Sequence, residues 1–144
     1  MTNVLIIKLG ALGDVLRTTC ILDGLRKKFC DIKISWLTAS DALCLLEDNP
    51  LINKVYIIEN TSSTNLLLNQ SYDLVVNLDD DPIACDLATR LDKKRIFGAY
   101  TNNGRCQYTS DSADWFDMSL ISNFGKEEAD ARKRLNQLSY PEIL

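Results

Sequence analysis

Short aliphatic runs recur along the chain, separated by segments with helical or turn-like patterns, and this alternation constrains the fold more than any other feature. The first run ends at Gly10, as a strand covered on both faces of a parallel sheet does. The predicted strands are residues 4–9, 32–37, 54–58, 72–78 and 94–98. Strands alternating with helices favour right-handed βαβ units, and they predict an α/β, Rossmann-like doubly wound parallel sheet of order 3-2-1-4-5. Ligands of such sheets bind at the carboxyl ends of strands one and four.

The segments between these runs carry helical patterns. Apolar and small side chains at spacings of three, four and seven predict a helix over residues 14–29, with basic residues at its end. A short helix capped by Thr38 or Ser40 is expected after the second strand, and another short helix around residues 66–68. Residues 79–81 with Pro82 predict the start of a helix that runs to about residue 91.

The alternation ends after Gly98. Residues 99–113 are polar and rich in turn formers, which predicts either a hairpin extension or a loop over the sheet edge. A short helix is expected over residues 115–121. An exposed amphipathic helix is expected over residues 127–138, with Ala131, Leu135 and Leu138 on its apolar stripe. We therefore predict one domain, residues 1–144, with residues 99–144 as an extension of the sheet.

Composition excludes several classes of protein. The 144 residues, 46% of them hydrophobic, suffice for one core without disulfides or metals. Acidic side chains outnumber basic ones by 20 to 16, so no nucleic-acid partner is expected. The absence of histidine excludes the Ser-His-Asp and Cys-His hydrolases. The five cysteines include no CxxC pair, and Cys20, Cys44 and Cys85 are expected to act as small hydrophobic residues. Reduced thiols, with neither a signal peptide nor a membrane span, predict a cytoplasmic protein.

The most informative segment is KLGALGDVLRTT, residues 8–19, where a strand turns directly into a helix. Gly10 and Gly13 let the backbone approach a ligand closely, or they only permit a tight turn. The spacing is neither the GxGxxG fingerprint of dinucleotide sites nor the Walker A motif. Asp14 then has two possible roles, as the cap of the helix or as a general base that faces the cleft.

Other polar residues lie near the same strand ends. The turn is flanked by Lys8, Arg17 and Thr18, which are candidates for contacts with an acceptor. The cations Lys8 and Arg17 would contact its phosphates. Asp79 and Asp80, with Asp81, follow the fourth strand, and we expect them to cap the next helix and to bind sugar hydroxyls. No metal and no cofactor are expected. The acidic pair of response-regulator receivers follows strand one, where this chain has Gly-Ala-Leu-Gly, which counts against phosphotransfer.

Residues 4–29, VLIIKLGALGDVLRTTCILDGLRKKF, and ISWLT at residues 34–38 resemble the opening of the lipopolysaccharide heptosyltransferase-like family of glycosyltransferases. The resemblance continues through NPLINKV at residues 49–55 and YDLVVNL at residues 72–78. It implies the N-terminal, acceptor-binding half of a GT-B fold, with residues 99–144 leading toward a C-terminal donor domain that lies outside this chain. Without that donor domain, the chain alone is expected to be inactive.

The resemblance also implies a reaction. In the family, the aspartate that matches Asp14 is the proposed base for an inverting transfer of a sugar. The donor would be a nucleotide sugar such as ADP-heptose, bound by the missing domain, and the acceptor a lipopolysaccharide-type glycan at the inner face of the membrane. Residues 59–64 lack the basic cluster that a heavily phosphorylated acceptor would require, which leaves another glycan as an alternative acceptor.

Two other classes of protein remain as alternatives. The parallel sheet and glycine turn would also suit a non-catalytic nucleotide-binding module, although the missing GxGxxG counts against it. A pure interaction domain is the second alternative, because a half that lacks its partner exposes apolar surface and would form a homodimer. Peripheral association with the membrane is compatible with the glycosyltransferase interpretation.

Overall fold

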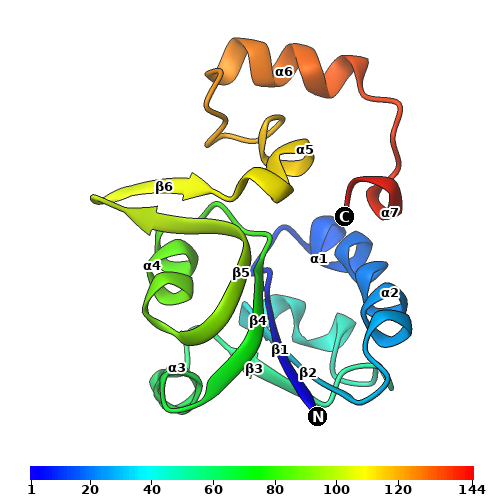
Figure 1. Ribbon diagram of the computed structural model, residues 1–144, viewed down its shortest axis with the longest axis vertical. Coiled ribbons are helices and arrows are strands. Elements are labelled where there is room, and N and C mark those ends of the chain that lie inside the picture. Colours follow the sequence, from blue (N-terminus) through cyan, green and yellow to red (C-terminus); the bar gives the residue numbers. More distant parts are fainter.

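A computed structural model describes residues 1–144, and its centre is a six-stranded sheet of order β3-β2-β1-β4-β5-β6 (Figure 1). The first five strands are parallel, and β6 pairs antiparallel with β5. The predicted order 3-2-1-4-5 is therefore confirmed. The strands are β1 (Thr2–Ile7), β2 (Ile32–Thr38), β3 (Lys54–Ile57), β4 (Ser71–Asn77), β5 (Asp92–Asn102) and β6 (Arg105–Tyr108).

Helices cover both faces of the sheet, because side chains alternate along each strand. Val4 and Ile6 of β1 pack on one face against α1 (Leu12–Thr18), α2 (Ile21–Lys28) and the 3₁₀ helix η1 (Ser40–Leu45). Leu5 and Ile7 pack on the other face against α3 (Thr61–Leu68) and α4 (Pro82–Arg90). Both clusters are almost fully buried, so β1 is a central strand, as its aliphatic run predicts.

Residues 99–113 form the hairpin extension, the first of the two predicted alternatives. Asn103 and Gly104 occupy the two-residue turn between β5 and β6, and both have positive φ, as a type I′ turn requires. The strand β5 is longer than predicted because it continues into this hairpin. It passes close to β4 at Gly98, whose φ is +108° and where a Cβ would lie 1.9 Å from the carbonyl oxygen of Asn77.

The remaining elements lie beyond the carboxyl ends of the parallel strands (Figure 1). They are the 3₁₀ helix η2 (Ser110–Ser112), α5 (Ala113–Phe116), α6 (Lys126–Leu135) and α7 (Tyr140–Ile143). A third, small core cluster joins Phe116 of α5 to Tyr108, Ala99 and Cys85, so this segment packs on the hairpin and on α4. No helix in the chain combines the length and the apolar character that a membrane span requires.

Four details of the predicted helices were wrong. The helix expected over residues 14–29 is two helices, because the hydroxyls of Thr18 and Thr19 bond backbone carbonyls of the preceding turn and the chain tightens there. Neither Thr38 nor Ser40 caps η1. Instead, the carboxylate of Glu59 accepts from the backbone N–H of Ser40 at 3.1 Å. The helix expected over residues 115–121 is α5, which ends at Phe116.

The fourth error concerns α6. Its buried residue is Ala129, whereas Leu135 is 79% exposed and Leu138 lies beyond the helix. The stripe of Ala131, Leu135 and Leu138 therefore does not face the core, because only the face around Ala129 meets the rest of the chain. Cys44 is also exposed, unlike Cys85, because η1 turns it away from the core.

Candidate functional site

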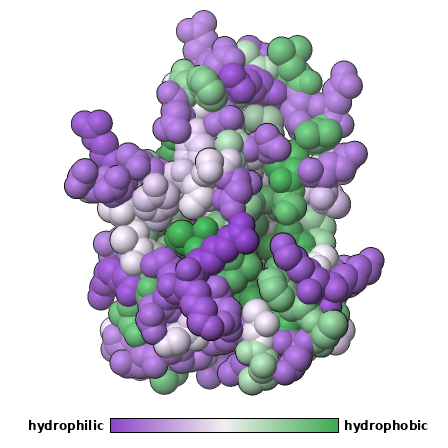
Figure 2. Space-filling view, viewed as in Figure 1, coloured by the Kyte–Doolittle hydropathy of each residue, from purple (hydrophilic) through white to green (hydrophobic).

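A cavity of about 1150 Å³ lies at the carboxyl ends of β1 and β4, where the doubly wound topology predicts a ligand site. Its floor is formed by residues 8–11 after β1, by Asp14 and Arg17 of α1, and by residues 78–83 after β4. The opposite wall comes from α5, α6 and α7. Figure 2 shows apolar side chains exposed along the middle of one face of the molecule, with hydrophilic side chains on both sides.

The turn after β1 is held from both neighbouring strands. The backbone N–H of Leu9 donates to Asp79 Oδ2 at 2.8 Å, and the indole N–H of Trp36 donates to the carbonyl of Lys8 at 3.4 Å. Gly10 follows, and a Cβ built there would meet nothing within 4 Å. The protein around it therefore does not require a glycine at this position for space, and a ligand can approach the backbone there.

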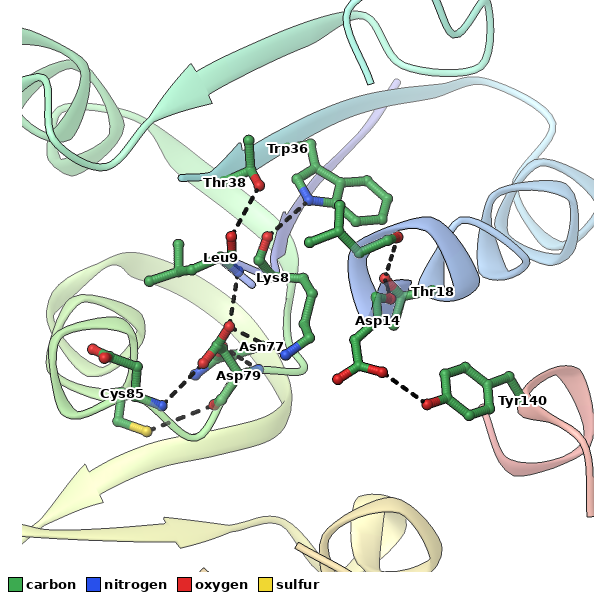
Figure 3. Close-up of polar contacts among 12 residues, drawn as sticks. Lys8, Leu9, Asp14, Thr18, Trp36, Thr38, Asn77, Asp79, Cys85 and Tyr140 are labelled. Atoms are coloured by element: carbon green, nitrogen blue, oxygen red, sulfur yellow. Dashed lines mark hydrogen bonds and ion pairs between the residues drawn. The ribbon is translucent and has the colours of Figure 1, made fainter. Parts of the chain in front are cut away.

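Lys8 and Asp79 form a buried ion pair on the floor of the cavity (Figure 3). Lys8 Nζ lies 3.3 Å from Asp79 Oδ2, and the two side chains are only 9% and 8% exposed. Asp79 Oδ1 also accepts from the backbone N–H of Asp81 at 3.0 Å. Lys8 thus neutralises Asp79 in the structure, and although it lines the cavity, its contact with a phosphate of an acceptor stays a prediction.

The three aspartates that follow β4 have different contacts. Asp81 is the N-cap of α4, and its carboxylate accepts from the backbone N–H of Ile83 at 2.8 Å, so the capping role is confirmed for Asp81. Asp79 is buried in the pair with Lys8, whereas Asp80 lines the cavity and its carboxylate makes no hydrogen bond or ion pair within the chain. Nowhere in the chain do three His, Cys, Asp or Glu side chains lie in an arrangement that could hold a metal ion.

Asp14 lies in the first turn of α1 and lines the cavity. The N-cap of this helix is Ala11, which makes no side-chain capping bond, so Asp14 is not the cap. The hydroxyl of Tyr140 donates to Asp14 Oδ1 at 3.1 Å, and Arg17 Nη1 lies 3.9 Å from the same oxygen (Figure 3). Asp14 Oδ2 has no hydrogen-bond partner within the chain. The Asp14 side chain is 42% exposed, so this oxygen is accessible to a ligand.

Three other sequence candidates take different positions. Arg17 lines the cavity, and the oxygen of Tyr140 is the main cause that raises the pKa of its guanidinium group. Thr18 is fully buried and its hydroxyl bonds the carbonyls of Asp14 and Val15, so it does not reach the cavity. Gly13 does not line the cavity either. The turn of α1 directs both residues away from the opening.

Sequence reasoning missed the residues on the opposite wall. Trp115, Lys126, Lys133 and Tyr140 line the cavity, although they lie more than 95 residues along the chain from Asp14. No local pattern around Tyr140 reveals this contact, because it depends on how the C-terminal segment folds back over the sheet. The Cys85 thiol adds no nucleophile to the site, since burial raises its pKa.

No protein-family model matches the chain. Lipopolysaccharide heptosyltransferase 3 of Escherichia coli is 35% identical over 80 residues, a match that covers 47% of this chain and 24% of that protein. Lipopolysaccharide heptosyltransferase 1 of Campylobacter coli is 34% identical over 56 residues, which covers 39% of this chain and 16% of that protein. The chain thus spans about a quarter or less of these relatives.

Several solved structures share the fold, and two of them show the extent of the likeness. Escherichia coli heptosyltransferase WaaC with ADP aligns with a TM-score of 0.59 at 22% identity, over 67% of this chain and 34% of WaaC. A glycosyl transferase family 9 protein from Veillonella parvula aligns with a TM-score of 0.61 at 21% identity, over 72% of this chain and 33% of its own. In sequence and in fold, the chain therefore resembles one part of the lipopolysaccharide heptosyltransferase-like glycosyltransferases.

Proposed function

We propose that the chain is the acceptor-side part of an inverting glycosyltransferase, with Asp14 as its general base. The observation that carries the proposal is the position of Asp14. It lines a large cavity at the predicted switch point of the sheet, and one carboxylate oxygen, Oδ2, is free of internal bonds. The likeness to heptosyltransferases supports the choice of glycosyl transfer among the reactions that a carboxylate base could serve.

The proposed reaction needs one base on the acceptor side. Asp14 Oδ2 takes the proton of an acceptor hydroxyl while that oxygen attacks the anomeric carbon of the donor sugar. The bond between the anomeric carbon and the diphosphate oxygen breaks, and the configuration at that carbon inverts. The donor is a nucleotide sugar, for which ADP-heptose is the leading candidate, because the similar WaaC structure contains ADP. A second domain outside these residues would hold it.

The charge of the cavity favours an acceptor rich in hydroxyls and poor in phosphate. Carboxylates outnumber cations in the lining, and the cation Lys8 is already paired with Asp79. The carboxylates are Asp14, Asp41, Glu59, Asp79, Asp80, Asp81 and Asp130, and the cations are Lys8, Arg17, Lys126 and Lys133. Carboxylate oxygens accept hydrogen bonds from sugar hydroxyls and repel phosphates. We therefore favour a glycan other than a heavily phosphorylated inner core.

The general-base role is tested by Asp14→Asn in the complete enzyme. We expect kcat to fall by about 10²- to 10⁴-fold, because an amide cannot take the proton, while the KM for the acceptor changes little. The melting temperature should change little, since Asp14 is not the helix cap and asparagine keeps an oxygen that can accept from Tyr140. Asp23→Asn, on the exposed side of α2 and away from the cavity, is the matched control. Full activity of Asp14→Asn would refute the proposed base.

A further inference from the structure

Tyr140 contacts the proposed base from the far end of the chain, 126 residues away. Its hydroxyl donates to Asp14 Oδ1 at 3.1 Å, and Figure 3 shows the two side chains pointing toward each other. Arg17 Nη1 lies on the same side of the carboxylate, 3.9 Å from Oδ1. Both partners thus act on one oxygen, and the other oxygen is left without a bond.

The Tyr140 ring is held independently of this hydrogen bond. It packs edge-to-face against Trp115 of α5, with ring centroids 5.0 Å apart and planes at 83°. The guanidinium carbon of Arg17 lies 5.7 Å from the centre of the ring. A capping box between Ser139 and Glu142 fixes the start of α7, and Leu144 packs against the core cluster that contains Val4 and Ile6. The hydroxyl is therefore held in a defined place above α1.

We infer that Tyr140 is a positioning residue for Asp14, an inference that rests on the function proposed above. A carboxylate that is 42% exposed rotates freely unless one of its oxygens is held. The bond from Tyr140 holds Oδ1 and leaves Oδ2 as the oxygen that takes the proton from the acceptor. In the transfer, the acceptor O–H bond breaks, a bond from Oδ2 to hydrogen forms, and Tyr140 keeps its own proton. Well-positioned reacting groups contribute several powers of ten to a rate.

Two variants of Tyr140 separate the effect of its hydroxyl from the effect of its ring. Tyr140→Phe removes the hydrogen bond and keeps the packing on Trp115 and Arg17, whereas Tyr140→Leu removes both. A positioning role predicts that kcat falls about 10- to 100-fold in Tyr140→Phe, and at least as far in Tyr140→Leu. The KM for the acceptor should stay within about twofold in Tyr140→Phe, because Tyr140 acts through Asp14 and not on the substrate.

A double-mutant cycle in the complete enzyme tests whether Tyr140 acts through Asp14. In an Asp14→Asn background, Tyr140→Phe should cause no further loss of kcat, because no base remains to be positioned. The indole N–H resonance of Trp115 reports the packing of the ring, and it should be unchanged in Tyr140→Phe. If that resonance moves, the kcat values of Tyr140→Phe and Tyr140→Leu still distinguish the two roles. A purely structural role of the ring predicts that only Tyr140→Leu loses activity.

The outcomes distinguish this inference from the function on which it rests. Activity of Tyr140→Phe within about twofold of the parent, while Asp14→Asn is inactive, would overturn the positioning role alone. An equal loss in both backgrounds would also overturn it. Full activity of Asp14→Asn would remove the proposed base itself. Loss in Tyr140→Phe that disappears in the Asp14→Asn background is the result we expect.

Discussion

At the scale of single residues, the buried pair of Lys8 and Asp79 should contribute most to stability near the site. Asp79 also accepts two backbone N–H bonds, from Leu9 and Asp81, so it joins the turn after β1 to the turn after β4. Removing one partner of a buried ion pair leaves an uncompensated charge, which costs about 3–5 kcal/mol. We expect Asp79→Ala to lower the free energy of unfolding by that amount, measured by urea denaturation.

Two variants control this prediction. Lys8→Met should cost less than Asp79→Ala, because the Asp79 carboxylate keeps its two backbone donors and only the ion pair is lost. Asp80→Ala, one residue along, removes a carboxylate without a hydrogen bond and should change the free energy of unfolding by no more than about 0.5 kcal/mol. Equal, small effects of Asp79→Ala and Asp80→Ala would mean that the buried pair does not stabilise the fold.

Local patterns predicted where functional residues lie along the chain better than what those residues contact. The glycine turn placed Asp14 at the start of a helix, but its role depends on where that helix begins, and Leu12 starts it two residues earlier than expected. Lys8 was expected beside an acceptor, yet it is buried because a carboxylate 71 residues away neutralises it. Tyr140 could not be found at all, since its contact with Asp14 crosses 126 residues.

At the scale of elements, the sheet could be predicted because each parallel strand carries its own aliphatic run. For residues 99–113, polar and turn-forming composition left a hairpin and a loop as alternatives. The structure forms the hairpin, where Asn103 and Gly104 both adopt the positive φ that a two-residue turn needs. The break between α1 and α2 was not predicted. The helix was inferred from the spacing of apolar residues, and this spacing does not reveal that threonine hydroxyls bond backbone carbonyls at the break.

The short helix α7 should undock from the cavity in acid. Hydrogen bonds from the hydroxyl and the backbone N–H of Ser139 lower the pKa of Glu142 from its ordinary value of 4.5. A lowered pKa means that the capped helix α7 binds protons less well than the uncapped one, so the stabilisation by the cap is present above the ordinary pKa and is lost as the pH falls through the lowered one. Because Tyr140 lies in α7, loss of the cap should weaken its docking. We expect the Trp115 indole resonance to shift toward its undocked position as the pH falls below the ordinary glutamate pKa of 4.5.

The variant Glu142→Gln isolates this effect from other acid titrations. It keeps the size of the side chain but removes the group that titrates, so docking of α7 should be weaker at neutral pH and nearly constant between pH 6 and pH 3. A Trp115 shift with the same midpoint in the parent and in Glu142→Gln would assign the transition to another carboxylate.

At the scale of the whole molecule, two parts of the chain form the cavity. The position of the first could be predicted from the sequence, and that of the second could not. The sheet supplies the floor at its predicted switch point. Residues 99–144 are predicted from the sequence as an extension of the sheet that leads toward a second domain. In the structure, α5, α6 and α7 of this segment lie over the strand ends and form the opposite wall of the cavity (Figure 1). These helices pack through a few contacts around Phe116, Ala129 and Tyr140. So few buried residues do not produce an apolar pattern from which the packing could be predicted.

The charge of the completed cavity leads to a prediction about ligands of the 144-residue chain. Only Lys126 and Lys133 among the lining cations are free of ion pairs, while carboxylates surround the opening. A neutral inner-core oligosaccharide should therefore bind more tightly than its phosphorylated form. In an amide-resolved NMR titration, it should shift residues 8–19, residues 79–81 and Tyr140. An ADP-sugar should neither bind strongly nor be turned over, because these two lysines alone would face its diphosphate.

Ionic strength supplies the internal control for this titration. Raising the salt concentration screens repulsion between exposed charges, so the affinity for the phosphorylated glycan should rise while that for the neutral glycan stays constant. Tighter binding of the phosphorylated form at low salt would contradict the charge argument and restore a phosphorylated inner core as acceptor. A site lined by carboxylates should bind sugar hydroxyls more tightly than an anionic nucleotide. If ADP or NAD shifted the resonances of residues 8–19 and neither glycan did, the nucleotide-binding alternative would replace the acceptor-side assignment.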